Sequence, residues 1–233
     1  PKAHKKGDGT WVTEADWAAE AQIRLRIARV FPEHNILGEE EGLTAAGGGK
    51  PAEGAPCWIV DPIDGTNNFI SGIPIWATLI ALRVDDVTIA GVAQAPALGE
   101  LYEGAIDLGA RLNGTSIFVS TVDRIKDASF AYAGVKDLYD AGLQPMFESL
   151  TSDCKRSRGF GDFWGHMLVA RGAMDIMIEP ELNLWDVAAL QPIVSEAGGR
   201  LTDLSGGEWR TRGPCITTNS ALHDHVLRLS RTG

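Results

Sequence analysis

The sequence has few cysteines, and they lie far apart. Cys57, Cys154 and Cys215 are the three in 233 residues. Their spacing matches no zinc site, and an odd number of scattered thiols does not suit a disulfide-stabilised secreted domain. We therefore expect a reducing compartment, the cytoplasm.

The sequence also lacks long apolar runs and an excess of positive charge. No run approaches the roughly 20 apolar residues that a membrane helix needs, and no signal peptide is evident. Because the sequence starts at Pro1 rather than Met, we expect that native residues precede it. The net charge is −10, whereas nucleic-acid binding requires clustered Lys and Arg. We therefore expect neither a membrane nor a nucleic acid as partner.

The remaining composition is that of an ordinary globular chain, 44% hydrophobic and 22% charged. We divide it at a change of pattern into two halves. In the first half, residues 1–124, we expect a mobile loop over residues 4–10 and a helix over residues 13–30. A Gly-, Ala- and Pro-rich excursion without structure follows over residues 43–56. Apolar runs separated by turn residues then predict a largely antiparallel sheet.

The second half, residues 125–233, alternates between the two periodicities. Strands are expected over residues 130–133 and 174–178, and helices over residues 137–150 and 185–197. Gly198 and Gly199 after the last of these helices are typical of a helix C-terminus. This alternation indicates an α/β half.

The stretch from Trp58 to Phe69 contains the strongest candidate for a functional site. A buried apolar strand runs into Asp61 and Asp64, with Pro62 stiffening the turn and Gly65 relaxing it. Two acids held close on a rigid turn repel each other unless a cation lies between them. A hard divalent cation such as Mg²⁺ prefers carboxylate oxygens. The alternative is an Asp-rich turn whose side chains cap backbone N–H groups.

Three other stretches carry acids with both a functional and a structural interpretation. Asp16 follows Thr13 at the position of a capping box and also favours the helix dipole. Glu39 opens a run of three acids, and such runs are usually solvated. Asp186 stands at the start of a helix, where an acid is common.

Taken together, G-E-E, D-P-I-D-G-T-N-N-F and W-D-V-A-A occur in an order that resembles the inositol monophosphatase-like superfamily of Mg²⁺-dependent phosphatases. The resemblance covers nearly the whole chain, from K-x-D-G near the start to E-A-G-G near the end. It implies an α+β / α/β fold, a layered αβαβα sandwich, and a homodimer as in many relatives. The apparent absence of a first helix is the main departure.

The resemblance also implies roles for particular residues. One metal ion would be held by Glu39, Asp61 and the Ile63 carbonyl, and a second by Asp61, Asp64 and Asp186; a third, weaker Mg²⁺ would share Glu39 through waters. Such a site of two or three Mg²⁺ ions supplies an activated water and neutralises phosphoryl oxygens. The other implied groups are the water-activating pair Thr66 and Asp16, the phosphate-binding N–H groups of Gly65 and Thr66, and a mobile loop at Lys6-Gly7-Asp8.

The segment around residue 160 bears on the substrate, a small phosphate ester. Arg158-Gly159-Phe160-Gly161-Asp162, with the later P-E-L-N-L-W-D, looks like the histidinol-phosphate phosphatases of this superfamily. Histidinol phosphate is cationic at its ammonium and imidazole, and carboxylates would pair with it. The implied substrate residues are Asp162 and Glu179, with Arg158 and Asn183 as weaker candidates.

Several alternatives remain open from the sequence. Asp162 would instead be the N-cap of the following helix. The substrate would instead be an inositol phosphate, another polyol phosphate or a nucleotide. A non-catalytic module that binds divalent metal is the alternative outside enzymes, although it would need no water-activating pair.

Overall fold

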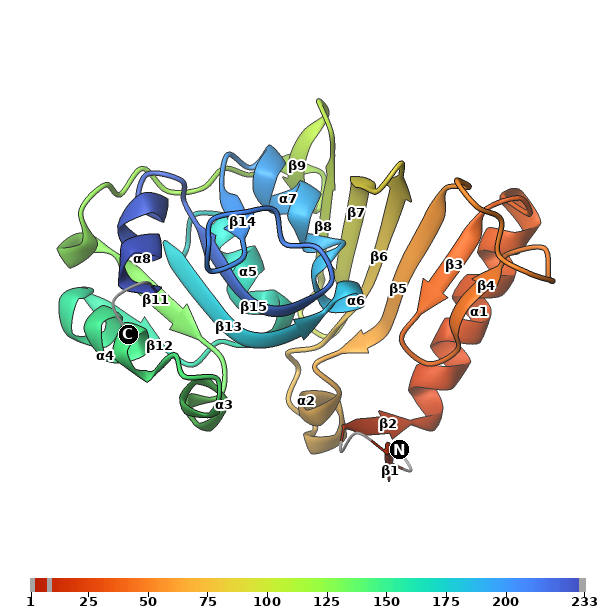
Figure 1. The fold of residues 1–233 in the computed structure, drawn as a ribbon, viewed down its shortest axis with the longest axis horizontal. Coiled ribbons are helices and arrows are strands. Elements are labelled where there is room, and N and C mark those ends of the chain that lie inside the picture. The colour runs from red at the N-terminus through yellow and green to blue at the C-terminus, as the bar shows by residue number, and fades with distance from the viewer. Residues whose placement is uncertain (1–2, 8–9, 231–233) are drawn as a thin grey trace.

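The protein is described by a computed structural model over residues 3–7 and 10–230. Helices and sheets alternate in five layers, in the order helix, sheet, helix, sheet, helix (Figure 1). The predicted αβαβα sandwich is therefore confirmed. In the described residues no helix is long and apolar enough to cross a membrane.

Within the described residues the first sheet has eight strands, in the order β10-β9-β8-β7-β6-β5-β3-β4. Neighbouring strands are antiparallel except β3 and β5, which are parallel. The strands are β3 (Asn35–Gly38), β4 (Gly42–Ala45), β5 (Cys57–Asp64), β6 (Ala77–Val84), β7 (Val87–Ala95), β8 (Glu100–Ala105), β9 (Gly109–Leu112) and β10 (Thr115–Ser116).

In the same described part, the second sheet has five strands, in the order β12-β11-β13-β15-β14. Strand β11 is parallel to β12 and to β13, whereas β15 is antiparallel to β13 and to β14. The strands are β11 (Ser129–Tyr132), β12 (Arg156–Arg158), β13 (Ile176–Asn183), β14 (Arg200–Thr202) and β15 (Arg212–Thr218). The chain passes from the first sheet to the second between β10 and β11; whether the halves 1–124 and 125–233 are separate domains stays a prediction.

The helices form the other three layers. Helix α1 (Glu14–Val30) packs on β5, and α5 (Asp162–Ala170) and α7 (Leu190–Glu196) lie between the sheets. Helices α3 (Val135–Asp140), α4 (Gln144–Asp153) and α8 (His223–Ser230) pack on the outer face of the second sheet. The short elements are α2 (Thr66–Ser71), α6 (Leu184–Val187) and the 3-10 turn Ile125–Asp127.

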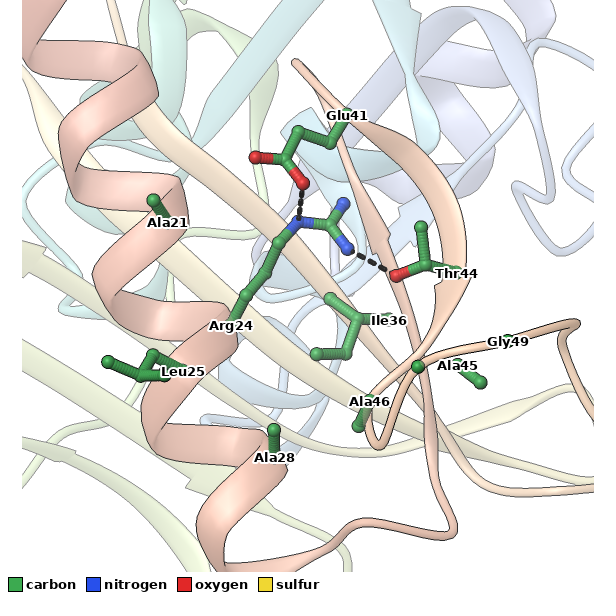
Figure 2. Close-up of a pocket in the computed structure, with 11 residues that line it drawn as sticks. Ala21, Arg24, Leu25, Ala28, Ile36, Glu41, Thr44, Ala45, Ala46 and Gly49 are labelled. Atoms are coloured by element: carbon green, nitrogen blue, oxygen red, sulfur yellow. Dashed lines mark hydrogen bonds and ion pairs between the residues drawn. The ribbon is translucent and has the colours of Figure 1, made fainter.

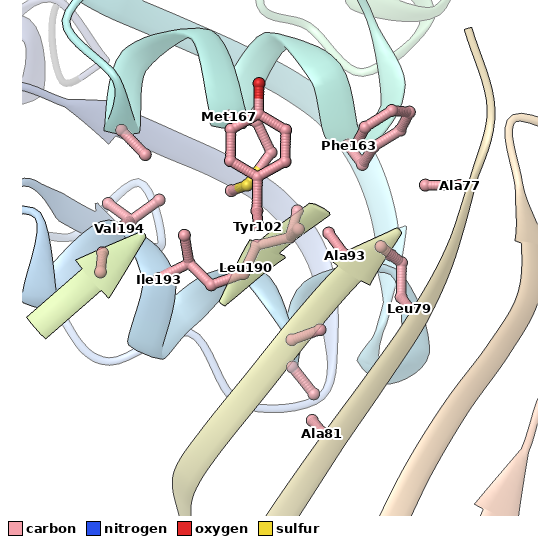
Figure 3. Close-up of a cluster of buried hydrophobic side chains, with 14 of the residues drawn as sticks. Ala77, Leu79, Ala81, Ala93, Tyr102, Phe163, Met167, Leu190, Ile193 and Val194 are labelled. Carbon is pink, nitrogen blue, oxygen red and sulfur yellow. The ribbon is translucent and has the colours of Figure 1, made fainter. Parts of the chain in front are cut away.

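The main core lies between the first sheet and helices α5 and α7 (Figure 3). Small strand residues such as Ala81 and Ala93 face larger helix side chains such as Met167 and Ile193. At Gly91 of β7 a Cβ would lie 2.1 Å from the carbonyl oxygen of Ala189, the residue that precedes α7, and at Gly104 of β8 a Cβ would lie 2.6 Å from the Cα of Ile193 in α7. Helix α7 can therefore lie close to the sheet because these two strand positions have no side chain.

Four expectations about local structure were wrong in part, the fourth being the helix over residues 185–197. Residues 3–5 form a strand, β1 (Ala3–Lys5), that pairs with β2 (Trp11–Thr13), and the His4 ring stacks on Trp17. The excursion at 43–56 begins with β4, which pairs with β3. The helix expected over 137–150 is two helices, because Gly142 adopts a left-handed φ of 73° between them.

The helix expected over 185–197 is divided into α6 and α7, although Ala188 and Ala189 between them keep helical dihedral angles. Its predicted end is confirmed. Gly198 has a φ of 87°, and the Gly199 N–H donates to the Val194 carbonyl at 2.9 Å. The other predicted helices and strands are present with shifts of a few residues at their ends.

Candidate active site

Asp61 and Asp64 stand at the end of the buried strand β5. The pairing with β6 shifts register between them, and the Thr78 hydroxyl donates to the Pro62 carbonyl at 2.9 Å. Gly65 then takes a left-handed φ of 79°, which turns the chain into α2. Both carboxylates are buried, at 2% and 7% exposure. The predicted rigid turn thus holds two acids away from water.

Asp186 reaches the same place from the start of α6. It completes a capping box in which its Oδ2 accepts from the Asn183 N–H at 2.6 Å. One oxygen each of Asp61, Asp64 and Asp186 lies within 4.8 Å of the others. The Phe163 N–H at the start of α5 donates to Asp64 Oδ2 at 2.9 Å. Elements of both sheets and of the middle helical layer therefore meet here.

Glu39 joins this group from the end of β3, which is parallel to β5. Its N–H donates to the Val60 carbonyl at 3.1 Å. The Lys6 ammonium lies 2.9 Å from Glu39 Oε1 and 2.6 Å from Glu40 Oε1. Asp8 of the predicted mobile loop lies outside the described residues. Hereafter the acidic cluster means Glu39, Asp61, Asp64 and Asp186.

The turn that carries Glu39 is held from α1. The buried Glu20 carboxylate accepts the N–H groups of Glu40 and Glu41 at 2.8 and 3.0 Å. Arg24 pairs with Glu20 at 2.8 Å and donates to the Thr44 hydroxyl at 2.8 Å. Figure 2 shows Arg24 reaching from α1 between Glu41 and Thr44, along a groove of about 430 Å³. The acids at 39–41 therefore belong to a fixed turn, in which Glu39 and Glu40 are half-buried and Glu41 is exposed.

Burial and mutual repulsion govern protonation in the acidic cluster. Burial, and then the charges of Glu39, Asp64 and Asp186, raise the pKa of Asp61 well above its ordinary value. Burial also raises the pKa of Asp186 to about 6 and raises that of Glu39 despite Lys6. The cluster is therefore hard to ionise without added positive charge.

The donor set of the acidic cluster fits a divalent cation. Asp61 Oδ1 is buried and has no hydrogen-bond partner among the residues that the structure describes. In the described part of the chain, Lys6 is the basic side chain that forms an ion pair with the acidic cluster, through Glu39, and it also pairs with Glu40. Carboxylate and carbonyl oxygens are the ligands that hard divalent cations prefer. The residues present therefore suit such an ion.

Asp16 and Thr66 each make a local hydrogen bond. Asp16 Oδ2 accepts from the Thr13 N–H at 2.8 Å and the Thr13 hydroxyl at 2.6 Å, so its capping-box interpretation is confirmed. Its Oδ1 is buried without a partner. The Thr66 hydroxyl donates to the Ile63 carbonyl at 2.9 Å. Helix α2 contacts β2, which precedes Asp16, and the pairing of Thr66 with Asp16 stays a prediction.

Asp162 is brought to the Asp61–Gly65 turn. Its Oδ2 accepts from Asn68 Nδ2 at 2.9 Å and would lie 3.4 Å from a Cβ at Gly65. The alternative that Asp162 caps α5 is wrong, because the N-cap is Gly161 and no side chain caps this helix. Asp162 has a left-handed φ of 55°, which is unusual for a residue with a side chain.

Glu179 lies on β13, where the pairing with β15 becomes irregular. The residue is 7% exposed, and its Oε2 is buried without a hydrogen-bond partner. Burial raises its pKa well above the ordinary value, and the charges of Asp162, Asp64 and Asp186 raise it further. The two predicted substrate acids therefore lie in the same electrostatic environment as the acidic cluster.

The two weaker candidates differ. Asn183 is the N-cap of α6 and holds Asp186 through its backbone and its side chain. Arg158 is exposed at the end of β12 and donates to the Ser157 carbonyl at 2.7 Å. No hydrogen bond or ion pair joins Arg158 to the acidic cluster within the described residues. Its contact with substrate stays a prediction.

Sequence reasoning missed three groups. The Asn68 side chain donates a hydrogen bond to Asp162, and the Phe163 N–H donates one to Asp64. His166 Nε2 lies 3.9 Å from Glu179 Oε2. Asn68 was visible inside the D-P-I-D-G-T-N-N-F motif, and His166 stands one helical turn after Asp162, where residues i and i+4 share a face. The contacts themselves depend on how α5 docks, which no local pattern reveals.

Comparison with known proteins agrees with this geometry. The family model of the inositol monophosphatase family matches residues 2–232. The histidinol-phosphatase of Streptomyces coelicolor is 41% identical over 97% of this chain and 86% of its own length. That of Mycobacterium tuberculosis is 42% identical over 98% and 87%. The fructose-1,6-bisphosphatase/inositol-1-monophosphatase of Aquifex aeolicus is 33% identical over 97% and 84%.

Solved structures show the same fold. The Thermotoga maritima IMPase superposes with a TM-score of 0.86 at 31% identity, over 99% of this chain and 87% of that one. The extragenic suppressor protein suhB from Bartonella henselae gives a TM-score of 0.88 at 29% identity, over 100% and 89%. A nearly complete family match, these relatives and the buried acids agree, and the chain belongs to the inositol monophosphatase family.

Proposed function

We propose that this phosphoric monoester hydrolase converts L-histidinol phosphate to L-histidinol and phosphate, a step of histidine biosynthesis. The observation that carries the proposal is the pair of acids beside the acidic cluster, Asp162, which is half-buried, and Glu179, which is buried. Asp162 meets the neutral Asn68 amide. His166 lies 3.9 Å from Glu179 and is neutral at pH 7, because burial lowers its pKa to about 3. An ammonium and an imidazolium would supply the missing positive charge.

The proposed cofactor is Mg²⁺, two or three ions, held by the acidic cluster and the Ile63 carbonyl. When bound, these ions would supply the positive charge that activates water and neutralises the phosphoryl oxygens. The unpartnered Asp61 Oδ1 and the raised pKa values of the cluster support this assignment.

The chain's own residues would position and deprotonate the attacking water. The Thr66 hydroxyl would turn its proton away from the Ile63 carbonyl, since a hydroxyl hydrogen rotates freely. Thr66 Oγ1 would take a proton from the attacking water, and its own hydroxyl proton would pass to Asp16 Oδ1, which is buried and has no hydrogen-bond partner among the described residues. The leaving oxygen of L-histidinol would take up a proton from solvent. The N–H groups of Gly65 and Thr66, at the start of α2, would bind the phosphate.

Phosphate release with Mg²⁺ tests this function. We expect a higher kcat/KM on L-histidinol phosphate than on inositol 1-phosphate or on a nucleotide 3′-phosphate. A preference for inositol 1-phosphate would overturn the substrate while leaving the reaction class in place. No release from any phosphate ester, with Mg²⁺ still bound, would favour a module that only binds metal.

We also propose a homodimer in the cytoplasm. Leu108 and Phe118 are apolar and 72% and 70% exposed, which supports burial against a second copy. Cys57, Cys154 and Cys215 are all free thiols, which suits a reducing compartment. Light scattering on the purified protein measures its mass in solution, and the mass of a monomer would contradict the proposed homodimer.

A further inference from the structure

Two buried polar atoms without hydrogen-bond partners in the described residues lie close to each other, one on His166 of α5 and one on the proposed substrate acid Glu179. His166 Nε2 and Glu179 Oε2 are 3.9 Å apart, and neither has a hydrogen-bond partner within residues 3–7 and 10–230. The residues are 1% and 7% exposed. The other ring nitrogen, His166 Nδ1, lies 2.8 Å from the Thr217 hydroxyl. A buried polar atom without a partner destabilises a protein, so both need an explanation.

The chemistry of a neutral imidazole provides one. A neutral ring has one N–H donor and one acceptor nitrogen. If the Thr217 hydroxyl donates to Nδ1, the proton of the ring is on Nε2 and points toward the Glu179 carboxylate. The present 3.9 Å exceeds hydrogen-bond length, and a shift of about 1 Å would bring it to about 2.9 Å.

We propose that His166 is a positioning residue for substrate choice, which donates from Nε2 to Glu179 and holds that carboxylate ionised toward the cationic part of the substrate. This inference rests on the proposed function, in which Glu179 contacts the cation. His166 and Asp162 both lie on α5, four residues apart, so one helix both provides a substrate acid and orients the other.

His223 is the matched control in the same fold. Both histidines are buried, and they meet consecutive threonines of β15, Thr217 and Thr218. Both nitrogens of His223 have hydroxyl partners, at 2.8 Å from Thr218 and 3.0 Å from Thr202. His223 is therefore satisfied within the core and has no part in the proposed site.

The test compares His166→Leu, His166→Gln and His223→Leu by the ratio of kcat/KM on histidinol phosphate to kcat/KM on phenyl phosphate, an ester without a cation. We expect His166→Leu to lower this ratio at least tenfold, mainly through KM for histidinol phosphate. His166→Gln, whose amide can still donate to Glu179, should recover most of the ratio. His223→Leu should lower the melting temperature and leave the ratio unchanged.

A measurement on the wild-type protein covers the case in which His166→Leu does not fold. Nitrogen-15 NMR of the imidazole, with L-histidinol and phosphate bound, should show the proton of His166 on Nε2. A proton on Nδ1 would overturn the inference. Normal wild-type turnover of histidinol phosphate with an unchanged ratio in His166→Leu would overturn this inference alone. No turnover by the wild type would overturn the proposed function and this inference with it.

Discussion

At the scale of single residues, the start of a helix places two of the important acids. Asp16 and Asp186 each occupy the third position of a helix, and each accepts at Oδ2 a hydrogen bond from the backbone N–H of the residue that caps the helix. The other oxygen of Asp16 has no partner, and Asp186 lies within the group of three acids. The capping box thus fixes the side chain and leaves an oxygen for chemistry, so the structural and functional interpretations are compatible.

Asp64→Asn separates stability from catalysis. An Asn oxygen can still accept from the Phe163 N–H, while one of several repelling charges is lost. We expect turnover to be abolished, and the metal-free protein to melt at an equal or slightly higher temperature, by up to a few degrees. Thermal unfolding with and without Mg²⁺, beside an activity assay, checks both. Full retained activity would contradict a metal-binding role for Asp64.

Asp162→Ala tests the substrate acids directly. The variant loses a carboxylate whose one side-chain hydrogen bond within the described residues is accepted from Asn68. We expect kcat/KM on histidinol phosphate to fall at least tenfold, because a buried charge pair with the substrate contributes more than about 1.4 kcal/mol. Activity on inositol 1-phosphate should change less. An equal loss on both substrates would argue against a pocket role.

The lowered pKa of His223 should make the folded protein less stable at acidic pH. Burial, reinforced by the Arg200 charge, lowers the pKa of His223 from 6.5 to about 4. The unfolded chain therefore takes up a proton at higher pH than the folded one, and stability falls as pH drops from about 6.5 to about 4. The loss from this group is on the order of 2 kcal/mol. His166 acts in the same direction.

A comparison of the wild type with His223→Leu tests whether His223 causes this loss of stability at low pH. Leu cannot titrate, so the variant should be less stable at pH 7 and should lose less of its stability between pH 6.5 and pH 4. Urea unfolding at several pH values gives the two slopes. Parallel curves for the two proteins would show that His223 is not the titrating group.

At the scale of elements, close backbone packing decides where α7 lies. A Cβ at Gly91 would lie 2.1 Å from the Ala189 carbonyl oxygen, and backbone cannot yield as a flexible side chain can. We expect Gly91→Ala to lower the free energy of unfolding by about 1–3 kcal/mol or more. The matched control is Gly159→Ala, where the nearest atom is 3.6 Å away. Equal melting temperatures of the two variants would contradict the packing explanation.

Element types followed from the sequence where the cause is local. Helix α1 begins after a capping Thr13, and the turn at Asn113-Gly114 has the left-handed angles that this dipeptide favours. The long helix expected over 137–150 failed because the apolar pattern continues across Gly142 although the backbone breaks there. Strand β1 was missed because three residues carry too little pattern.

The candidate site also has some features that follow from local sequence and others that do not. The acids at strand ends and helix starts were predictable, since their placement is a local property of Asp61, Asp64 and Asp186. The pairing of Lys6 with Glu39 and Glu40, and of His166 with Glu179, arises only when distant segments dock. The sequence places Lys6 in a loop and gives no role to His166.

At the scale of the whole molecule, the acidic cluster connects the two sheets. Glu39, Asp61 and Asp64 come from the first sheet, whereas Asp186 follows β13 of the second. A divalent ion between them would bind the folded state alone. At 100 times its dissociation constant it adds about 2.7 kcal/mol, or roughly 5–10 °C in a chain of this size.

Removal of metal should therefore lower the melting temperature. We expect a chelator to reduce it by several degrees, and Mg²⁺ to restore it in a concentration-dependent way. Asp64→Asn is the control and should respond little to either treatment. A wild-type melting temperature that is independent of both would contradict binding between the sheets.

The order in which the ligands occur along the chain has a consequence for synthesis. Glu39 and Asp186 are 147 positions apart (186 − 39). At roughly 5–20 residues per second, a ribosome makes Asp186 about 7 to 30 seconds after Glu39. Asp61 and Asp64 share one turn, and Glu39 follows the strand that pairs with theirs, but Asp186 can join them only when the second half has been made and docks. We therefore expect the ion to act on this last folding step.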